Sequence, residues 1–252
     1  MILNRIKKIR KKFKDLNIDG YIIPKNDEFF SEYAENDRLK NISNFTGSAG
    51  LAIILKKKNY LFVDGRYTIQ AQNECGKNFR IIEIHKKLPH TIIKNCKLGF
   101  DPHLFTTNNL KRYFSTNNEL ISINENIIDK IYKNKKKKTK SFFSLSAKIA
   151  GQTHHSKIKK IMNFLNFKKV DYLYVSAPEN VAWLLNIRGY DNPTSPIPNS
   201  RLIIGKNKKI FLFTTKKNAQ KIIIEKKIKK KQVFDYHDFN ELVNQLRGSN
   251  FI

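Results

Sequence analysis

An internal repeat constrains the fold of this chain more than any other feature of its sequence. In each half, a helical pattern is followed by one short apolar run, and later by two β runs that a polar Lys/Asn turn separates. The single runs are residues 21–24 and 172–175, and the paired runs span residues 51–63 and 202–213. Because helices alternate with strands, we expect an α/β fold of two tandem domains of about 120 residues, each a mixed sheet flanked by helices.

The helix that opens each half carries apolar residues at spacings of three and four, which places them on one face. These residues are Ile2, Ile6, Ile9, Phe13 and Leu16 in the first half, and Ile158, Ile161, Met162 and Leu165 in the second. Asp19 and Gly20 are expected to end the first helix, and Thr153 or Ser156 to cap the second.

A run of like charge lies between the halves, at Lys133-Asn134-Lys135-Lys136-Lys137-Lys138. Like charges repel one another and favour a solvated connector. We therefore expect domains at residues 1–140 and 141–252, with the boundary between about 133 and 145.

The C-terminal residues predict a helix followed by the beginning of a strand. Asp238 is placed to start the helix, Gly248 to end it, and residues 249–252 to begin a strand that the chain does not complete. We therefore expect a truncated second domain, less stable than the first, with Leu242 and Leu246 partly uncovered.

The formal net charge of +28 leaves two interpretations open. A basic chain is typical of nucleic-acid-binding proteins. However, 40 of the 49 basic residues are Lys, and they are spread along the whole chain together with many Asn and Ile. This distribution favours a compositional bias over a designed patch, so we expect nucleic acid to bind only non-specifically.

The two cysteines, Cys75 and Cys96, form neither a disulfide framework nor a metal-binding spacing, which favours a reducing, cytoplasmic setting. No apolar run approaches the roughly 18 residues of a membrane span. The first 20 residues are charged at short intervals and do not resemble a secretory signal. We expect a cytoplasmic protein without membrane contacts.

Two turns in the first half carry candidate functional residues. The segment Phe45-Thr46-Gly47-Ser48-Ala49-Gly50 could present amides to an anion, but no helix pattern or phosphate-loop Lys follows it, so a tight turn is favoured. Asp64 could be a general base or a metal ligand, yet a single carboxylate is weak support for either role. We expect Asp64 and Arg66 to form a structural pair that anchors their turn.

A Pro-rich loop in the second half is the other candidate. It runs from Arg188 to Pro198, and three prolines in six residues restrict its backbone. Its polar and aromatic residues Arg188, Tyr190, Asp191 and Asn192 could line a cleft or control substrate access; alternatively, the loop is a rigid connector.

The six histidines show no metal-binding pattern. Adjacent His154 and His155 should point about 100° apart on a helix and could not easily share a metal.

Together, these segments resemble the N-terminal region of the aminopeptidase P (Xaa-Pro aminopeptidase), or creatinase-like, family. The matching segments are, in order, Tyr21-Ile22-Ile23-Pro24 with Asp27-Glu28 and Glu32-Tyr33; Arg38-Leu39; Phe45 to Gly50; Leu61 to Thr68 with Gln70; Gly99-Phe100-Asp101-Pro102; Gly151 with His155 and Lys157; and Ala182 to Gly189 with Asp191 and Pro193. The resemblance covers almost the whole chain. It is closest to the three-domain type, in which two creatinase-N-like (ribonuclease H-like) domains precede the peptidase.

The resemblance implies a metallopeptidase, a hydrolase that releases an N-terminal residue preceding proline. Its two metal ions, commonly manganese, are held by two Asp, one His and two Glu of a C-terminal domain. No segment here matches those motifs, so we expect no catalytic residue, no metal ligand and no bound cofactor in this chain. Proline-containing peptides would be bound by the missing domain.

The resemblance also implies that the N-terminal domains cover one side of the active-site cleft and contribute to homo-oligomer contacts. The loop from Arg188 to Pro198 would be the segment nearest that cleft. We therefore expect a non-catalytic fragment of such an enzyme. Two alternatives remain open: a stand-alone adaptor or peptide-binding module, and a basic nucleic-acid-binding protein.

Overall fold

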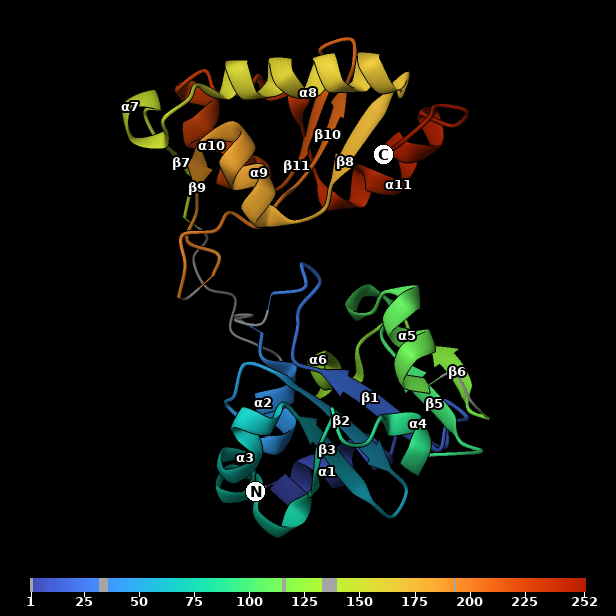
Figure 1. Cartoon of the computed structure of the whole chain (residues 1–252). Coiled ribbons are helices and arrows are strands. Elements are labelled where there is room, and N and C mark those ends of the chain that lie inside the picture. Colours follow the sequence, from blue (N-terminus) through green and yellow to red (C-terminus); the bar gives the residue numbers. More distant parts are fainter. Residues whose placement is uncertain (1, 32–35, 115–116, 133–139, 193) are drawn as a thin grey trace. The chain divides into compact units, whose positions relative to one another are not determined.

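The computed structural model describes residues 2–31, 36–114, 117–132, 140–192 and 194–252 (Figure 1). The chain forms two compact units, Met1–Lys136 and Lys137–Ile252. The lysine run expected to connect them, residues 133–138, lies outside the described residues. No described helix has the length and apolar character needed to cross a membrane.

The first unit is built on a six-stranded sheet in the order β4-β3-β2-β1-β5-β6. The strands are β1 (Gly20–Pro24), β2 (Gly50–Leu55), β3 (Asn59–Val63), β4 (Arg80–Glu83), β5 (Lys97–Phe100) and β6 (Glu119–Ser122). Strand β2 is antiparallel to both its neighbours, and every other adjacent pair is parallel. Five strands therefore run in one direction, and their carboxyl ends share one edge of the sheet with the start of β2.

Helices cover both faces of this sheet. The helices are α1 (Ile2–Arg10), α2 (Arg38–Ser43), α3 (Thr68–Cys75), α4 (Pro89–Ile92), α5 (Thr107–Phe114) and α6 (Ile127–Ile131). Apolar residues of α1, α2, α3 and α6 share one core with Tyr21 and Ile23, whereas residues of α5 share another with Ile22. This division follows from the alternation of side chains along β1, and it confirms the buried strand predicted at residues 21–24.

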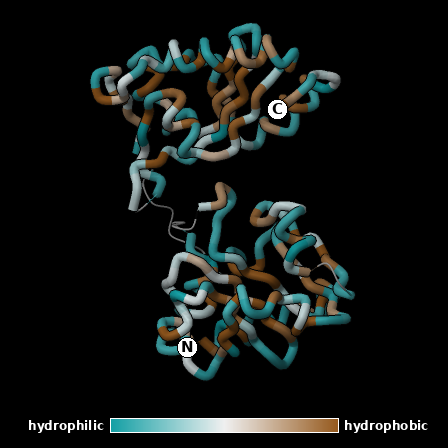
Figure 2. Tube along the Cα trace, viewed as in Figure 1, coloured by the Kyte–Doolittle hydropathy of each residue, from teal (hydrophilic) through white to brown (hydrophobic). Residues whose placement is uncertain are grey.

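The second unit contains a four-stranded sheet in the order β12-β11-β10-β8 and a separate pair, β7 with β9. The strands are β7 (Phe143–Ser144), β8 (Tyr172–Val175), β9 (Ile187–Arg188), β10 (Arg201–Gly205), β11 (Ile210–Phe213) and β12 (Val233–Phe234). The helices are α7 (Ala147–Ala150), α8 (His154–Lys168), α9 (Pro178–Leu185), α10 (Lys216–Ile224) and α11 (Phe239–Gln245). Figure 2 shows hydrophobic residues along the strands of both sheets.

The two sheets repeat one topology, because β12-β11-β10-β8 has the order and directions of β4-β3-β2-β1. An aspartate just before the first strand of each copy makes the same pair of contacts. Asp19 accepts hydrogen bonds from Lys56 Nζ and the Lys97 amide, and Asp171 accepts them from Lys206 Nζ and the Asn250 amide. The two halves therefore share the order of their strands, as the sequence repeat predicts, and also the hydrogen bonds of an equivalent aspartate.

The last residues of the chain pair with the free edge of β8. Phe251 forms a parallel bridge with Tyr172, and the Tyr174 amide donates to the Ile252 carbonyl. This position beside β8 corresponds to that of β5 beside β1, so residues 249–252 pair where the sequence predicts the start of a strand, although they form only an isolated bridge. Leu242, expected to be partly uncovered, is instead buried against Tyr172, Ile203 and Phe213.

Two local predictions are settled at helix ends. The first helix ends at Arg10, not at Asp19, because the chain continues in turns that keep Phe13 buried before Gly20 enters β1. At α8, Thr153 is the cap, since its hydroxyl accepts from the Ser156 amide at 3.2 Å.

Candidate functional site at the carboxyl edge of the first sheet

Polar side chains gather at the carboxyl ends of the five strands of the first sheet that run in one direction. They are Asp27 and Glu28 after β1, Asp64 and Arg66 after β3, His85 after β4, Asp101 and His103 after β5, and Asn126 and Asp129 after β6. In open α/β sheets, ligands bind outside the carboxyl ends of the strands. This edge is therefore the first place to look for a functional site.

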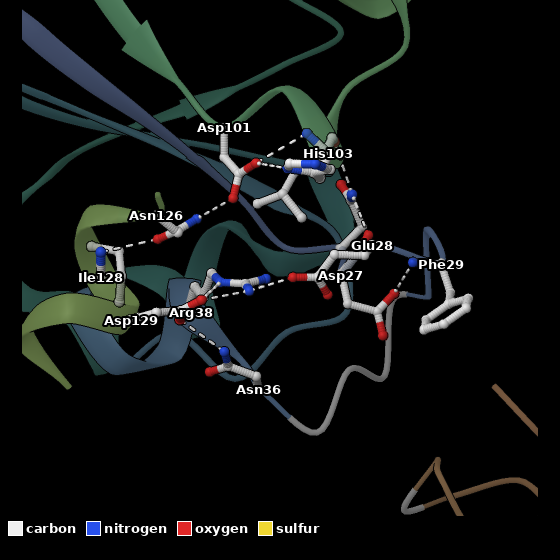
Figure 3. A network of polar contacts seen from close by, with 12 residues as sticks. Asp27, Glu28, Phe29, Asn36, Arg38, Asp101, His103, Asn126, Ile128 and Asp129 are labelled. Carbon is white, nitrogen blue, oxygen red and sulfur yellow. Dashed lines mark hydrogen bonds and ion pairs between the residues drawn. The ribbon is translucent and has the colours of Figure 1, made fainter. Parts of the chain in front are cut away.

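A buried arginine organises one part of the edge (Figure 3). Arg38 is only 4% exposed, and its guanidinium makes a bidentate contact with Asp129 at 2.7–3.1 Å. It also forms an ion pair with Glu28, and Asn36 donates to the same Asp129 carboxylate at 2.8 Å. Burial opposes the charge, but the contacts with Asp129 and Glu28 outweigh it and raise the pKa of Arg38. The network fixes α2 against α6.

A second chain of contacts joins the segments after β5 and β6. The Asp101 carboxylate accepts from Asn126 Nδ2 at 2.9 Å, and Asn126 Oδ1 in turn accepts from the Ile128 amide, capping α6 (Figure 3). Asp101 also accepts from the His103 amide and lies 3.0 Å from His103 Nδ1. These carboxylate oxygens bind groups of the fold itself, which is a structural role.

Asp27 shapes the loop that follows β1. Its buried carboxylate accepts from the amides of Phe29 and Ser31, both at 2.9 Å, and burial raises the pKa of this group. The loop turns sharply at Phe30, which has a φ of +60° and a side chain that is 47% exposed.

Asp64 and Arg66 are brought together by the turn after β3. Asp64 Oδ1 accepts from the Arg66 amide at 3.0 Å and from Arg66 Nε at 2.8 Å. The hydrogen bond from the Arg66 side chain, with that from its amide, lowers the pKa of Asp64 to about 2. The other oxygen, Oδ2, lies 3.6 Å from Nε2 of the exposed His85. Asp64 also lines a cavity of about 280 Å³.

The Gly-rich turn before β2 already holds an anionic group of this chain. The amide and hydroxyl of Thr46 donate to the Glu74 carboxylate, and Gln70 donates to it as well. A Cβ on Gly47 would lie 2.3 Å from the Phe45 ring, so only glycine fits there. Both facts support a tight turn with a structural role.

The loop expected to line a cleft lies in the second unit and is held by its own side chains. Arg188 Nη1 donates to the Ile187 carbonyl at 2.8 Å, and the Asp191 carboxylate accepts from the Asn199 amide at 2.8 Å. Asn192 Oδ1 accepts from the Thr194 amide at 3.0 Å. These three candidates contribute hydrogen bonds to the loop itself.

Tyr190 differs from those three. Its side chain is 57% exposed, its ring lies 5.3 Å from that of Phe143, and Lys140 Nζ lies 5.0 Å above it. Of the four residues singled out in this loop, Tyr190 is thus the one that presents a large surface to solvent.

A buried lysine joins the two helices that precede this loop. Lys157 of α8 is 3% exposed; its Nζ donates to the Trp183 carbonyl at 2.8 Å and to Asn186 Oδ1 at 2.7 Å, and lies 4.1 Å from the Trp183 ring centre. Burial lowers the pKa of Lys157. The sequence showed Lys157 only as part of a family motif, not as a buried cation.

The adjacent histidines lie closer together than expected. The ring centres of His154 and His155 are 3.9 Å apart, because side-chain rotation brings the rings together although their Cα–Cβ bonds diverge along the helix. Burial, with smaller contributions from His155 and Lys227, lowers the pKa of His154 to about 4. Among the residues with described positions, no group of three His, Cys, Asp or Glu side chains could hold a metal ion.

Comparison with known proteins identifies the class of both units. A model of the creatinase/prolidase N-terminal domain matches residues 5–131, and a second model with the same description matches residues 133–252. The chain belongs to the creatinase/prolidase N-terminal domain family and carries two such domains in tandem, as predicted.

The relatives narrow this class to the N-terminal region of Xaa-Pro aminopeptidases. A probable Xaa-Pro aminopeptidase P of Laccaria bicolor is 32% identical over 77% of this chain and 33% of the relative. Xaa-Pro aminopeptidase 1 of Dictyostelium discoideum is 30% identical over 84% of this chain and 37% of the relative. The chain thus spans about a third of the length of these relatives.

A solved structure shows the same fold. The X-prolyl aminopeptidase of Caenorhabditis elegans, described as a cytosolic enzyme with a di-nuclear active site, superposes with a TM-score of 0.84. The match covers 98% of this chain and 44% of that chain at 24% identity. Both domains of the chain therefore have the architecture of this enzyme.

Proposed function

We propose that this chain is the non-catalytic N-terminal region of an Xaa-Pro aminopeptidase. In this proposal, the residue preceding proline is released in a catalytic domain that lies outside these 252 residues. The observation that carries the proposal is the tandem match: two N-terminal domains fill the chain, while the chain covers about a third of its relatives.

The metal centre of the reaction belongs, in this proposal, to that other domain, which would bind two ions, with manganese as the expected metal. The described residues of this chain do not fit such a centre, since they contain no set of three candidate ligands. We assign no step of the reaction to a residue of this chain.

The proposed contribution of this chain is to restrict access to the active site. Proline-containing peptides would reach the catalytic domain past the loop of residues 188–198, and Tyr190 is the residue we expect to contact them because its ring is exposed. A homo-oligomer and a cytoplasmic location are part of the proposal; the free thiols of Cys75 and Cys96 are compatible with that location.

The test combines the purified chain with the catalytic part of a related Xaa-Pro aminopeptidase expressed without its own N-terminal domains. Release of the first residue from short and long Xaa-Pro peptides is measured with manganese present. The chain alone should give no release above a metal-only blank. Added to the catalytic part, it should bind that part and reduce turnover of the longer peptide relative to the shorter one.

Two results would count against the proposal. Chelator-sensitive release by the chain alone would place catalysis within it. Failure to bind the catalytic part, or binding without any change in peptide preference, would favour a separate adaptor role. Tyr190→Ala should reduce the length preference, and Phe167→Ala, which removes another exposed aromatic ring of the same domain, is the matched control.

A further inference from the structure

A cavity at the carboxyl edge of the first sheet has the composition of a small-molecule site. Its volume is about 280 Å³, and Leu51 at the start of β2, Phe62 at the end of β3, and Phe105 and Tyr113 after β5 provide much of its apolar lining. Small-molecule sites commonly combine apolar walls with a few polar groups, at volumes from roughly 300 Å³ upwards. The cavity lies at the edge where open α/β sheets bind their ligands.

The charge of the lining is unlike that of the chain. Lys and Arg account for 49 of 252 residues, yet no Lys or Arg is among the described residues that line this cavity. Its lining does include the acidic residue Asp64. Because Arg66 occupies Oδ1 and His85 lies 3.6 Å from Oδ2, the second oxygen can still accept a short hydrogen bond.

A second acceptor in the lining is the side-chain oxygen of Asn26. Both hydrogen bonds formed by Asn26 use its Nδ2 group, which donates to the carbonyls of Asp27 and Leu104 at 3.1 and 3.0 Å. Within the described part of the chain, its Oδ1 atom accepts no hydrogen bond. The polar residues among the described lining are Asp64, Asn26, Asn109 and the exposed His85. Asp64 and the free Asn26 oxygen suit a ligand that donates hydrogen bonds and carries positive charge.

We propose that this cavity binds a small organic amine carrying an aromatic or branched apolar group. The apolar group packs against Phe105 and Tyr113, which line the cavity and are partly exposed, and the ammonium donates to Asp64 Oδ2. This binding site is independent of the peptidase role proposed above, and it requires no residue outside the first domain.

The test is a titration of the full ¹⁵N-labelled chain followed by NMR. The probes are 2-phenylethylamine, the neutral 2-phenylethanol and the anionic 3-phenylpropionate. The amine should shift amide signals of residues 49–51 and 62–64, and it should bind roughly tenfold more tightly than the alcohol. Equal or tighter binding of the alcohol or the acid, or shifts confined to other residues, would overturn the proposal.

Three variants separate the site from general effects of charge. Asp64→Asn retains an acceptor for the Arg66 amide and should reduce amine affinity roughly tenfold. Glu83→Gln, which removes a nearby carboxylate that does not line the cavity and forms an ion pair with Lys86, should leave it unchanged. Ala49→Leu should fill the cavity and abolish binding. Unaltered binding in a folded Ala49→Leu variant refutes the site even if Asp64→Asn fails to fold.

Discussion

Arg38 shows how one buried side chain can join distant segments of this fold. Its contacts with Asp129 span 91 residues, and both partner carboxylates are partly exposed. Arg38→Gln removes the charge that both carboxylates contact, and it should lower the free energy of unfolding of the first domain by about 2–3 kcal/mol. This expected loss is smaller than the roughly 3–5 kcal/mol lost when one partner of a fully buried ion pair is removed, because water reaches the two carboxylates here.

Urea denaturation can assign that loss to the first domain. Far-UV circular dichroism follows both domains, whereas fluorescence follows the single tryptophan, Trp183, in the second. The Arg38→Gln change should shift only the circular dichroism transition. The control Arg66→Gln alters an exposed pair and should have a much smaller effect; equal effects would contradict the role given to the buried guanidinium.

His154 should make the second domain sensitive to acid. Its folded-state pKa of about 4 lies below the ordinary value of 6.5, so the unfolded chain binds more protons between these values. The stability contributed by the neutral ring is therefore fully present above pH 6.5 and is lost as the pH falls towards 4, by about 1–2 kcal/mol because solvent screens this partly exposed ring.

The measurement is the urea midpoint from Trp183 fluorescence at a series of pH values. His154→Gln should flatten the curve between pH 6.5 and 4 relative to the parent chain. His237→Gln changes an exposed histidine in another part of the same domain and serves as the control. A parent curve that is already flat in this window, or an unchanged slope in His154→Gln, would show that His154 is not the group responsible.

Among the secondary-structure elements, α8 offers a direct test of a cap. Thr153→Ala removes the hydroxyl that accepts from the Ser156 amide, and it should lower the free energy of unfolding of the second domain by about 1 kcal/mol. Ser156→Ala keeps that amide and removes only a contact with Gln152, so it should have a smaller effect. If both changes cost the same, the stability of α8 does not depend on this cap.

Elements with strong periodicity could be predicted from the sequence, because burial of one face or of a whole strand leaves a local pattern. Residues 21–24 and 172–175 are strands for this reason. The end of the first helix at Arg10 could not be predicted, since the apolar spacing continues to Phe13 through turns that also bury their side chains.

The candidate site was less predictable than the elements that carry it. Asp64 and Arg66 are two residues apart, so a local turn explains their pairing. The pairing of Arg38 with Asp129, and the enclosure of a cavity between Asn26 and Tyr113, depend on where the strands lie in the finished sheet. Neither leaves a periodic signal in the sequence.

At the scale of the whole molecule, the charge of +28 should govern association with polyanions. Four lysines, Lys208, Lys209, Lys229 and Lys231, do gather around a depression of about 560 Å³ in the second domain. The sequence favours a compositional bias, in which the lysines are spread over the whole chain, over a patch that binds nucleic acid. The two interpretations predict different effects of mutating this cluster.

Binding of single-stranded DNA distinguishes them. If the charge acts as a diffuse field, affinity should not depend on base sequence, and it should fall by roughly 100-fold between 50 and 200 mM salt if about five phosphates are contacted. Replacing Lys208 and Lys209 by Glu should weaken binding about as much as replacing Lys11 and Lys12, since both changes reverse two exposed charges. Fluorescence anisotropy of a labelled oligonucleotide measures both effects. Loss of binding in the first variant, with normal binding in the second, would instead establish a defined nucleic-acid site on the second domain.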